Sequence, residues 1–296
     1  MKYPNFFIVG AAKSGTSSLW QYLKQHPLVF MPEDELYKEP GFFSDLRRGK
    51  RTLDNYLEIF SKTKENHTLV GEASTAYLTD PSSAKNIYDF NPQAKIIIVL
   101  RNPVDRAYSL YNWMTQDGYE YAPTFEIALK FEKYRKNKKI PNFFEPEYYY
   151  NYLYFNSGLY YQQVKRYLDL FERNNVHIIK FDDLKNNFEK TYSNLCSFLE
   201  IEKTPISPKI FNKSKSLFSP TIQFILRKIN NSLNKHIKKN TRTKETRDKL
   251  MKLGVIKKKP FKIKKSTKQM LKSKYIQDIK NLSKLTDINF NSWLQN

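Results

Sequence analysis

The sequence has little cysteine and little histidine, and this limits the kinds of site it can form. Its 296 residues include one cysteine, Cys196, and four histidines. A single thiol cannot close a disulfide within the chain, and the scattered histidines give no dense cluster of metal ligands. We therefore expect no metal site and a protein of a reducing compartment.

Long hydrophobic runs are also missing. No run approaches the roughly 20 apolar residues of a membrane-spanning helix. The apolar stretch near the N-terminus is too short for a signal peptide. We therefore expect a cytoplasmic protein without a membrane anchor. At 40% hydrophobic and 15% aromatic residues, the chain can still build a core, which excludes a wholly disordered protein.

The positive charge is concentrated in the last third of the chain. The formal net charge is +22, and residues 205–296 hold 24 Lys and Arg against 4 Asp and Glu, which leaves the first 204 residues nearly neutral. A basic segment of this kind attracts polyanions such as an anionic substrate or surface. The same excess also fits compositional drift in an Asn-, Ile- and Tyr-rich chain, and both interpretations stay open.

Short apolar runs alternate with stretches of helical spacing. Buried strands are predicted at residues 5–9, 95–100 and 176–181, with weaker candidates at 29–31 and 69–70, and helices at 14–25, 104–115, 159–171 and 188–199. This alternation predicts an α/β fold with a central, mainly parallel sheet flanked by helices. We expect one domain over 1–296, with a helical insertion or lid at 119–151, a basic loop region at 205–265 and a C-terminal helix at 268–285.

The first strand is followed by a loop of small residues that suits a phosphate. Residues 10–17 (GAAKSGTS) combine glycines, hydroxyl side chains and Lys13 just before a predicted helix. Such a loop directs backbone N–H groups toward one point at the positive end of a helix. The nucleotide triphosphatase motif is not met, because Lys13 precedes Gly15 instead of following it. The alternative is an ordinary strand–helix turn with capping serines.

A second polar segment follows the strand at 95–100. Arg101 stands where that strand ends, and Ser109 lies about two helical turns further along. Ligands bind at the carboxyl edge of such sheets, so Arg101 and Ser109 are candidates to hold one phosphate between them.

Together, these segments resemble the PAPS-dependent sulfotransferases, where PAPS is 3′-phosphoadenosine 5′-phosphosulfate. Residues 12–17 (AKSGTS) look like that family's 5′-phosphosulfate loop, and residues 101–109 (RNPVDRAYS) look like its 3′-phosphate segment. Residues 38–44 (KEPGFFS) and 71–77 (GEASTAY) are similar to segments of the carbohydrate, heparan sulfate sulfotransferase-like branch. Further similar segments are Gly158-x-Tyr160, residues 178–184 (IIKFDDL), residues 212–216 (NKSKS) and the ending at 285–293.

The resemblance implies a bacterial-type enzyme with a P-loop-like three-layer fold, which moves a sulfuryl group from PAPS, without a metal, to a hydroxyl or amine of a carbohydrate. It implies Glu39 as the general base and Lys13 as a second catalytic residue, with Lys38, Glu72 and Ser74 on the substrate side. The residues implied to bind PAPS are Lys13, Ser14, Gly15, Thr16, Ser17, Arg101 and Ser109, together with Lys213 and Lys215 in a loop that closes over the nucleotide.

Two other functions stay open at this point. A P-loop kinase-like enzyme shares the strand–loop–helix, but it needs a Gly-Lys-Ser/Thr order and an Asp for magnesium, which are absent here. A nucleic-acid-binding protein that uses the basic C-terminal third is the second alternative. No helix-turn-helix, zinc-finger or RNA-binding signature supports it, so nucleic acid is not an expected partner.

Overall fold

The computed structural model describes residues 2–32, 39–45, 52–136, 146–206, 216–217, 220–236, 255–256 and 263–295. By its internal contacts the chain divides into two compact units. The first comprises Met1–Arg106, Leu159–Phe211 and Tyr275–Asn296, and the second comprises Ala107–Gly158 and Asn212–Lys274.

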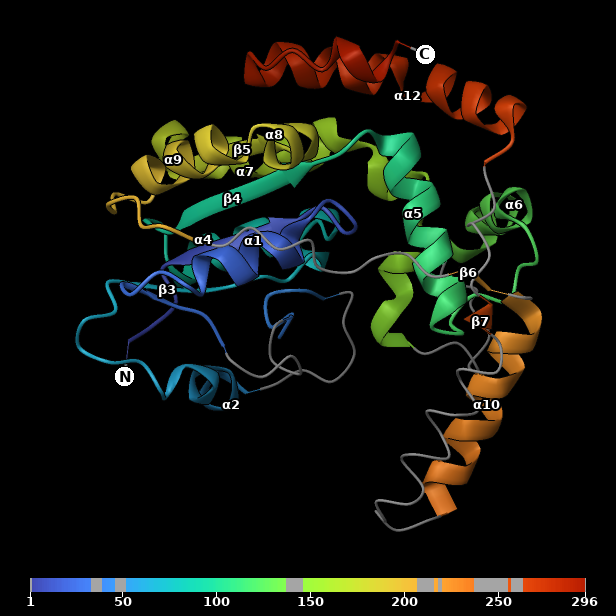
Figure 1. Ribbon diagram of the computed structural model, residues 1–296, viewed down its shortest axis with the longest axis horizontal. Helices are drawn as coiled ribbons and strands as arrows, with labels where there is room; N and C mark the ends of the chain where they lie inside the picture. The colour runs from blue at the N-terminus through green and yellow to red at the C-terminus, as the bar shows by residue number, and fades with distance from the viewer. Residues whose placement is uncertain are drawn as a thin grey trace. The chain divides into compact units, whose positions relative to one another are not determined.

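The first unit is built on a five-stranded sheet in the order β2-β3-β1-β4-β5. All four neighbouring pairs run parallel, as the strand arrows of Figure 1 illustrate. The strands are β1 (Phe6–Gly10), β2 (Val29–Phe30), β3 (Leu69–Glu72), β4 (Lys95–Leu100) and β5 (Val176–Lys180). Strands β1 and β3 are buried throughout, and β1 is the continuous apolar run that a strand of a parallel sheet should be. The predicted parallel α/β sheet is confirmed.

Helices cover the sheet and bury both of its faces. One cluster joins Phe6 and Ile8 of β1 to Leu19 of α1 (Thr16–Leu23), Leu184 of α8 (Phe181–Asn186) and Leu195 of α9 (Phe188–Phe198). Because side chains alternate along a strand, Phe7 points to the opposite face, where its ring meets that of Phe43 at 5.7 Å. The remaining helices of this unit include α2 (Leu53–Leu57), α3 (Ala76–Thr79), α4 (Ser83–Phe90) and α7 (Tyr160–Leu170).

Two long helices run from one unit into the other. They are α5 (Pro103–Gln116) and α12 (Lys265–Thr286). The helix predicted at 104–115 corresponds to α5, and the C-terminal helix predicted at 268–285 corresponds to α12, which begins three residues earlier and ends one residue later.

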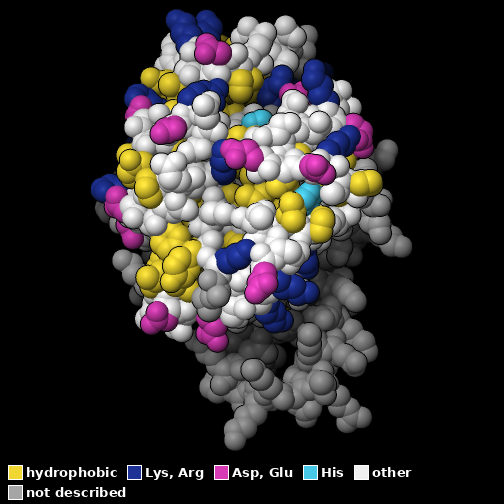
Figure 2. Space-filling view, turned by 90° about the vertical axis from the view of Figure 1, so that its left-hand side faces the viewer, with side chains coloured by type: hydrophobic (Ala, Val, Ile, Leu, Met, Phe, Trp, Pro, Cys, Tyr) yellow, Lys and Arg dark blue, Asp and Glu magenta, His cyan; other side chains and the backbone are white. Residues whose placement is uncertain are grey.

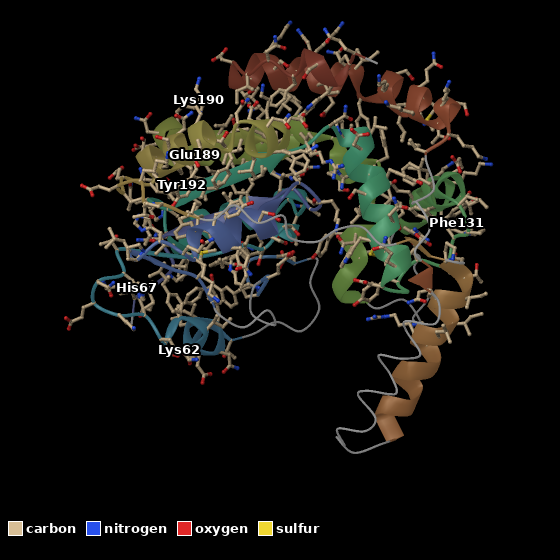
Figure 3. The ribbon with its side chains drawn as sticks, in the orientation of Figure 1. Lys62, His67, Phe131, Glu189, Lys190 and Tyr192 are labelled. Atoms are coloured by element: carbon tan, nitrogen blue, oxygen red, sulfur yellow. The ribbon has the colours of Figure 1, made fainter. Side chains whose placement is uncertain are left out.

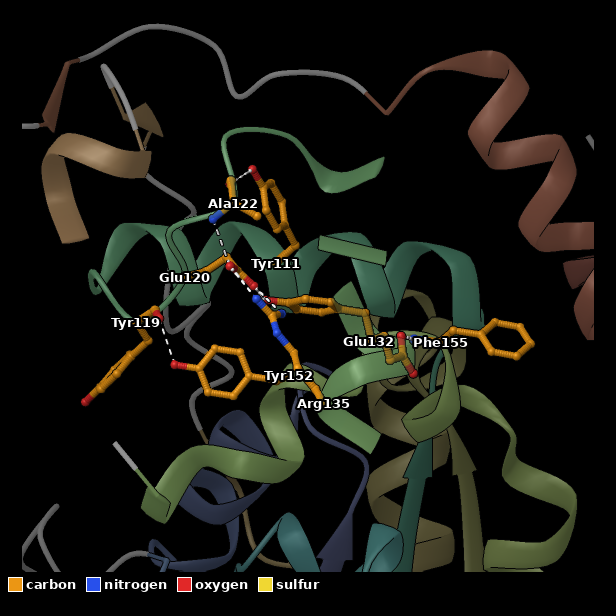
Figure 4. A network of polar contacts seen from close by, with 9 residues as sticks. Tyr111, Tyr119, Glu120, Ala122, Glu132, Arg135, Tyr152 and Phe155 are labelled. Atoms are coloured by element: carbon orange, nitrogen blue, oxygen red, sulfur yellow. Dashed lines mark hydrogen bonds and ion pairs between the residues drawn. The ribbon is translucent and has the colours of Figure 1, made fainter. Parts of the chain in front are cut away.

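The second unit has a buried ion pair at its centre, shown in Figure 4. Arg135 of α6 (Phe125–Lys136) donates two hydrogen bonds to Glu120, at 2.6 and 2.9 Å, and the two side chains are 5% and 0% exposed. The Tyr154 hydroxyl and the Ala122 N–H also donate to Glu120. Although burial alone lowers the pKa of Arg135, the hydrogen bonds and charge of Glu120 raise it above its ordinary value. This pair joins α6 to the segment that precedes it, at Glu120.

The stretch 205–265, expected as a basic loop region, contains a helix. Helix α10 (Pro220–His236) occupies 17 of its residues, and the short strands β6 (Ser216–Leu217) and β7 (Val255–Ile256) pair antiparallel. In the sequence, Pro220 favours a loop. In the structure it is the first residue of α10, which suits proline because the N–H at the first helical position needs no partner within the helix.

The described surface carries charges of both signs. On the face shown in Figure 2, Lys and Arg side chains are interspersed with Asp and Glu side chains. On α9, Glu189 and Lys190 are exposed whereas Tyr192 is buried (Figure 3). Within the described parts of the chain, no helix is both long enough and apolar enough to cross a membrane.

Candidate functional site

The loop between β1 and α1 turns tightly through two residues with left-handed backbone. Lys13 has φ 66° and Gly15 has φ 88°. For lysine this conformation costs roughly 1–2 kcal/mol, whereas glycine adopts it freely. A Cβ at position 15 would also lie 3.0 Å from the Phe181 ring, so glycine allows this close approach. Turns of this kind point successive backbone N–H groups toward one anion.

The polar groups of this loop fit a bound phosphate. Ser14 is fully buried, and its hydroxyl has no hydrogen-bond partner among the described residues. A buried polar group without a partner costs about 1–3 kcal/mol, which a ligand can relieve. Helix α1 begins at Thr16 and carries no acidic residue in its first turn, so its positive end is not neutralised from within the helix.

Arg101 lies against the same loop. Its guanidinium donates a hydrogen bond to the Lys13 carbonyl oxygen at 3.1 Å and stacks over the Phe181 ring at 4.9 Å. Burial lowers the pKa of Arg101, which means that its charge is poorly solvated. An anion beside Arg101 would compensate for that lost solvation.

The backbone at the end of β4 is held by segments distant in sequence. The Tyr160 hydroxyl donates to the Arg101 carbonyl oxygen at 3.0 Å. The Asn102 side chain donates to the Trp293 carbonyl oxygen at 3.3 Å, and the Trp293 indole N–H donates to Asp182 at 3.4 Å. The motifs at 158–160 and 285–293 therefore meet the end of β4 and support Arg101.

Glu39 lies beside the end of β1. One of its carboxylate oxygens accepts hydrogen bonds from the Thr75 hydroxyl at 2.9 Å and from the Thr75 N–H at 3.3 Å. A Cβ added at Gly10 would lie 3.3 Å from the Thr75 carbonyl oxygen and 2.7 Å from the Leu78 Cβ. Thr75, which holds Glu39, therefore lies close to Gly10, where the loop that contains Lys13 begins.

A second carboxylate, Glu72, is buried at the end of β3. It is 0% exposed and accepts hydrogen bonds from the hydroxyls of Ser74 at 2.5 Å, Tyr77 at 2.7 Å and Tyr56 at 3.0 Å. Burial has the largest effect on the pKa of Glu72 and raises it, these three hydrogen bonds lower it, and the charge of Glu39 raises it. Together they place the pKa at about 7. Two carboxylates thus interact at this edge of the sheet.

Comparison with known proteins assigns this arrangement to a family. The family model of the sulfotransferase domain matches residues 3–285. This chain belongs to the sulfotransferase family. A crystal structure of a sulfotransferase from Alicyclobacillus acidocaldarius is 30% identical, with a TM-score of 0.73 and 99% of each chain covered.

Curated relatives of this sulfotransferase domain include enzymes named for carbohydrates. The bifunctional heparan sulfate N-deacetylase/N-sulfotransferase 1 of Caenorhabditis briggsae is 26% identical over 229 residues, covering 77% of this chain and 25% of that protein. Carbohydrate sulfotransferase 15 of Mus musculus is 24% identical over 256 residues, covering 70% of this chain and 45% of that protein. The chain therefore spans between a quarter and half of the length of these relatives.

The structure of the sulfotransferase domain brings together only part of the predicted site. The Lys13 loop, Arg101 and the pair of carboxylates Glu39 and Glu72 gather at the carboxyl edge of β1, β3 and β4. Ser109 is half-buried within α5, in the second unit, and its pairing with Arg101 stays a prediction. Lys38, Lys213 and Lys215 lie outside the described residues.

Several residues that contact this site carry no sequence signal of their own. Thr75, which donates both hydrogen bonds to Glu39, stands within the 71–77 motif, but nothing in the motif distinguishes it from its neighbours. Phe181, which contacts both Arg101 and Gly15, stands at the end of the 176–181 strand prediction. Tyr56 lies outside every motif, and only the fold brings it to Glu72.

Proposed function

We propose that this protein transfers a sulfuryl group from PAPS to a hydroxyl or amine of a carbohydrate, with Glu39 as the general base. The observation that carries the proposal is the juxtaposition at the end of β1. There Glu39, through Thr75, adjoins the loop that contains Lys13 and the Ser14 hydroxyl, which has no hydrogen-bond partner in the part of the chain that the structure describes. A base beside a phosphate loop is what transfer from a nucleotide donor requires.

The loop and the end of β4 would bind the donor. Backbone N–H groups of residues 15–17, with the hydroxyls of Ser14, Thr16 and Ser17, would hold the 5′-phosphate at the positive end of α1, since the Ser14 N–H already donates to the Ala11 carbonyl oxygen. Arg101 and Ser109 would hold the 3′-phosphate and thereby reject nucleotides that lack it. Lys213 and Lys215 are the candidates for closure over the nucleotide.

Glu39 and Lys13 would act on opposite sides of the transferred group. Glu39 accepts the proton from the attacking hydroxyl or amine, whose oxygen or nitrogen forms the new bond to sulfur. The bond between sulfur and the bridging phosphate oxygen breaks, and 3′,5′-ADP leaves with the electron pair. Lys13 neutralises the negative charge that develops on that oxygen. Lys38 is proposed on the substrate side, with Glu72 and Ser74, which are 0% and 1% exposed, in the layer behind it.

The carbohydrate acceptor is proposed from the relatives and from the type of base. Proteins named for heparan sulfate and carbohydrate sulfotransfer match 77% and 70% of this chain. The basic C-terminal third suits an acceptor that carries negative charge.

The donor site is tested by thermal unfolding with 3′,5′-ADP, with 5′-ADP as the control, on the wild type and on Lys13→Ala. At a hundred times its dissociation constant, a ligand adds about 2.7 kcal/mol to the free energy of unfolding. We expect stabilisation by 3′,5′-ADP only, and a smaller effect in Lys13→Ala. An equal response to both nucleotides favours a kinase-like enzyme, and no response to either refutes the proposed donor.

A further inference from the structure

The cluster around Glu72 does more than satisfy a buried carboxylate. Two of the three hydroxyls that donate to Glu72 also accept a backbone N–H from the segment that follows Glu39. The Gly41 N–H donates to the Ser74 hydroxyl at 2.9 Å, and the Phe43 N–H donates to the Tyr77 hydroxyl at 3.3 Å. Ser74 and Tyr77 are therefore bridges between Glu72 and the backbone of residues 41–43.

The direction of these hydrogen bonds depends on the charge of Glu72. A hydroxyl has one proton, so Ser74 and Tyr77 can accept from the backbone and donate to Glu72 at the same time. The ionised carboxylate accepts from all three hydroxyls. A protonated Glu72 lacks the charge that strengthens these hydrogen bonds, and an amide at this position presents N–H groups that cannot accept, so at least one hydroxyl must turn its proton away. The hydroxyl can still accept from the backbone, but its anchor to position 72 is weakened, and with it the bridge to residues 41–43.

We propose that Glu72 is a positioning residue for Glu39, acting through Ser74 and Tyr77 on the backbone at Gly41 and Phe43. This inference rests on the proposed role of Glu39 as the base. This support matters for a base, because Glu39 is only half-buried and the backbone that carries it must be held in a fixed place. A shift of about 1 Å in a reacting group lowers a rate by roughly a hundredfold.

The surroundings of Glu72 make this support depend on pH. Tyr56 of α2, Tyr77 of α3 and Tyr167 of α7 interact with Glu72 electrostatically, and Glu39 adds a second negative charge. Since the pKa of Glu72 is raised to about 7, the fully aligned cluster forms above that pH and is lost below it. Transfer should therefore show an acid limb near pH 7.

Two measurements on the same variants test the proposal. The first is kcat and KM against pH, with radiolabelled PAPS and a desulfated, de-N-acetylated glucosamine–uronic acid polysaccharide, which offers both amines and hydroxyls. The second is backbone hydrogen exchange of residues 39–45, which needs no acceptor. Tyr192→Phe is the matched control, because it removes a buried tyrosine hydroxyl from α9, outside the cluster.

Glu72→Gln and Tyr77→Phe should lower kcat by about 10- to 100-fold, with the KM for PAPS within twofold of the wild-type value. Exchange at Gly41 and Phe43 should be at least tenfold faster. Glu72→Gln should also lose the acid limb near pH 7. Tyr56→Phe keeps both bridges and removes a hydrogen bond that lowers the pKa of Glu72, so its acid limb should move to higher pH.

The outcomes separate this inference from the proposed function. If Glu39→Gln keeps the wild-type kcat, the proposed base is wrong and the inference fails with it. If Glu39→Gln is inactive but Glu72→Gln and Tyr77→Phe keep the wild-type kcat, the inference alone is wrong. A loss of kcat without faster exchange at Gly41 and Phe43 also overturns it, because the effect then does not pass through this segment. Should Glu72→Gln fail to fold, Tyr77→Phe decides.

Discussion

Replacing Glu72 with glutamine should change how the stability of the protein depends on pH. Burial raises the pKa of Glu72 from 4.5 to about 7. Between these two pH values the folded state binds a proton that the unfolded state has released. The contribution of Glu72 to stability is therefore complete below pH 4.5 and is lost as the pH rises through 7.

The size of the effect follows from the shift in pKa. A shift from 4.5 to about 7 corresponds to a loss on the order of 3 kcal/mol in the free energy of unfolding between pH 4.5 and pH 8. Glutamine does not titrate, so Glu72→Gln lacks this loss. Other titrating groups contribute to both proteins and largely cancel in the difference between them.

Urea unfolding of both proteins at several pH values between 4.5 and 8 measures this difference directly. Equal slopes with urea concentration establish that the unfolded states are comparable. We expect the wild type to lose stability relative to Glu72→Gln as the pH rises. A difference in the free energy of unfolding that stays constant with pH would show that Glu72 is ionised throughout this range and that burial does not raise its pKa.

Two further substitutions test the architecture around the site. Gly15→Ala should destabilise the protein by roughly 1–2 kcal/mol, because position 15 has a left-handed backbone and an added Cβ meets Phe181. The same change should weaken the binding of 3′,5′-ADP. An unchanged free energy of unfolding in chemical denaturation, together with an unchanged affinity for 3′,5′-ADP, would contradict this. Arg135→Met should destabilise the protein by about 3–5 kcal/mol, because it leaves Glu120 buried without its charged partner. Tyr149→Phe removes a hydroxyl that donates to the carbonyl oxygens of Arg135 and Lys136 but keeps the ion pair, so its effect in the same denaturation assay should be much smaller.

The parallel sheet could be predicted because its strands are short, continuous and apolar. The strand predicted at 95–100 coincides with β4, the one at 5–9 is shifted by one residue from β1, and the one at 176–181 ends one residue beyond β5. Such runs suit only positions that are buried on both faces. The 205–265 stretch contains no such apolar run. Its Pro220 suits a loop as well as the first position of a helix, so the sequence alone does not indicate α10.

The candidate site could be predicted only where its residues lie within one strand–loop–helix segment. The Lys13 loop is such a segment, so its small residues, lysine and hydroxyls stand together in the sequence. The contacts between Glu39 and Thr75, and between Glu72 and Tyr56, join residues 36 and 16 positions apart. Nothing in local spacing specifies them, because the parallel pairing of β2 with β3 and the packing of the segment between these strands bring the residues together.

The central claim is that Glu39 serves as the base for sulfuryl transfer. The most direct measurement is the rate at which radioactive sulfur passes from PAPS to the glucosamine–uronic acid polysaccharide, in the wild type and in Glu39→Gln, at saturating PAPS. We predict that Glu39→Gln binds 3′,5′-ADP as the wild type does but transfers at least about a hundredfold more slowly. Transfer by Glu39→Gln at the wild-type rate would contradict the account.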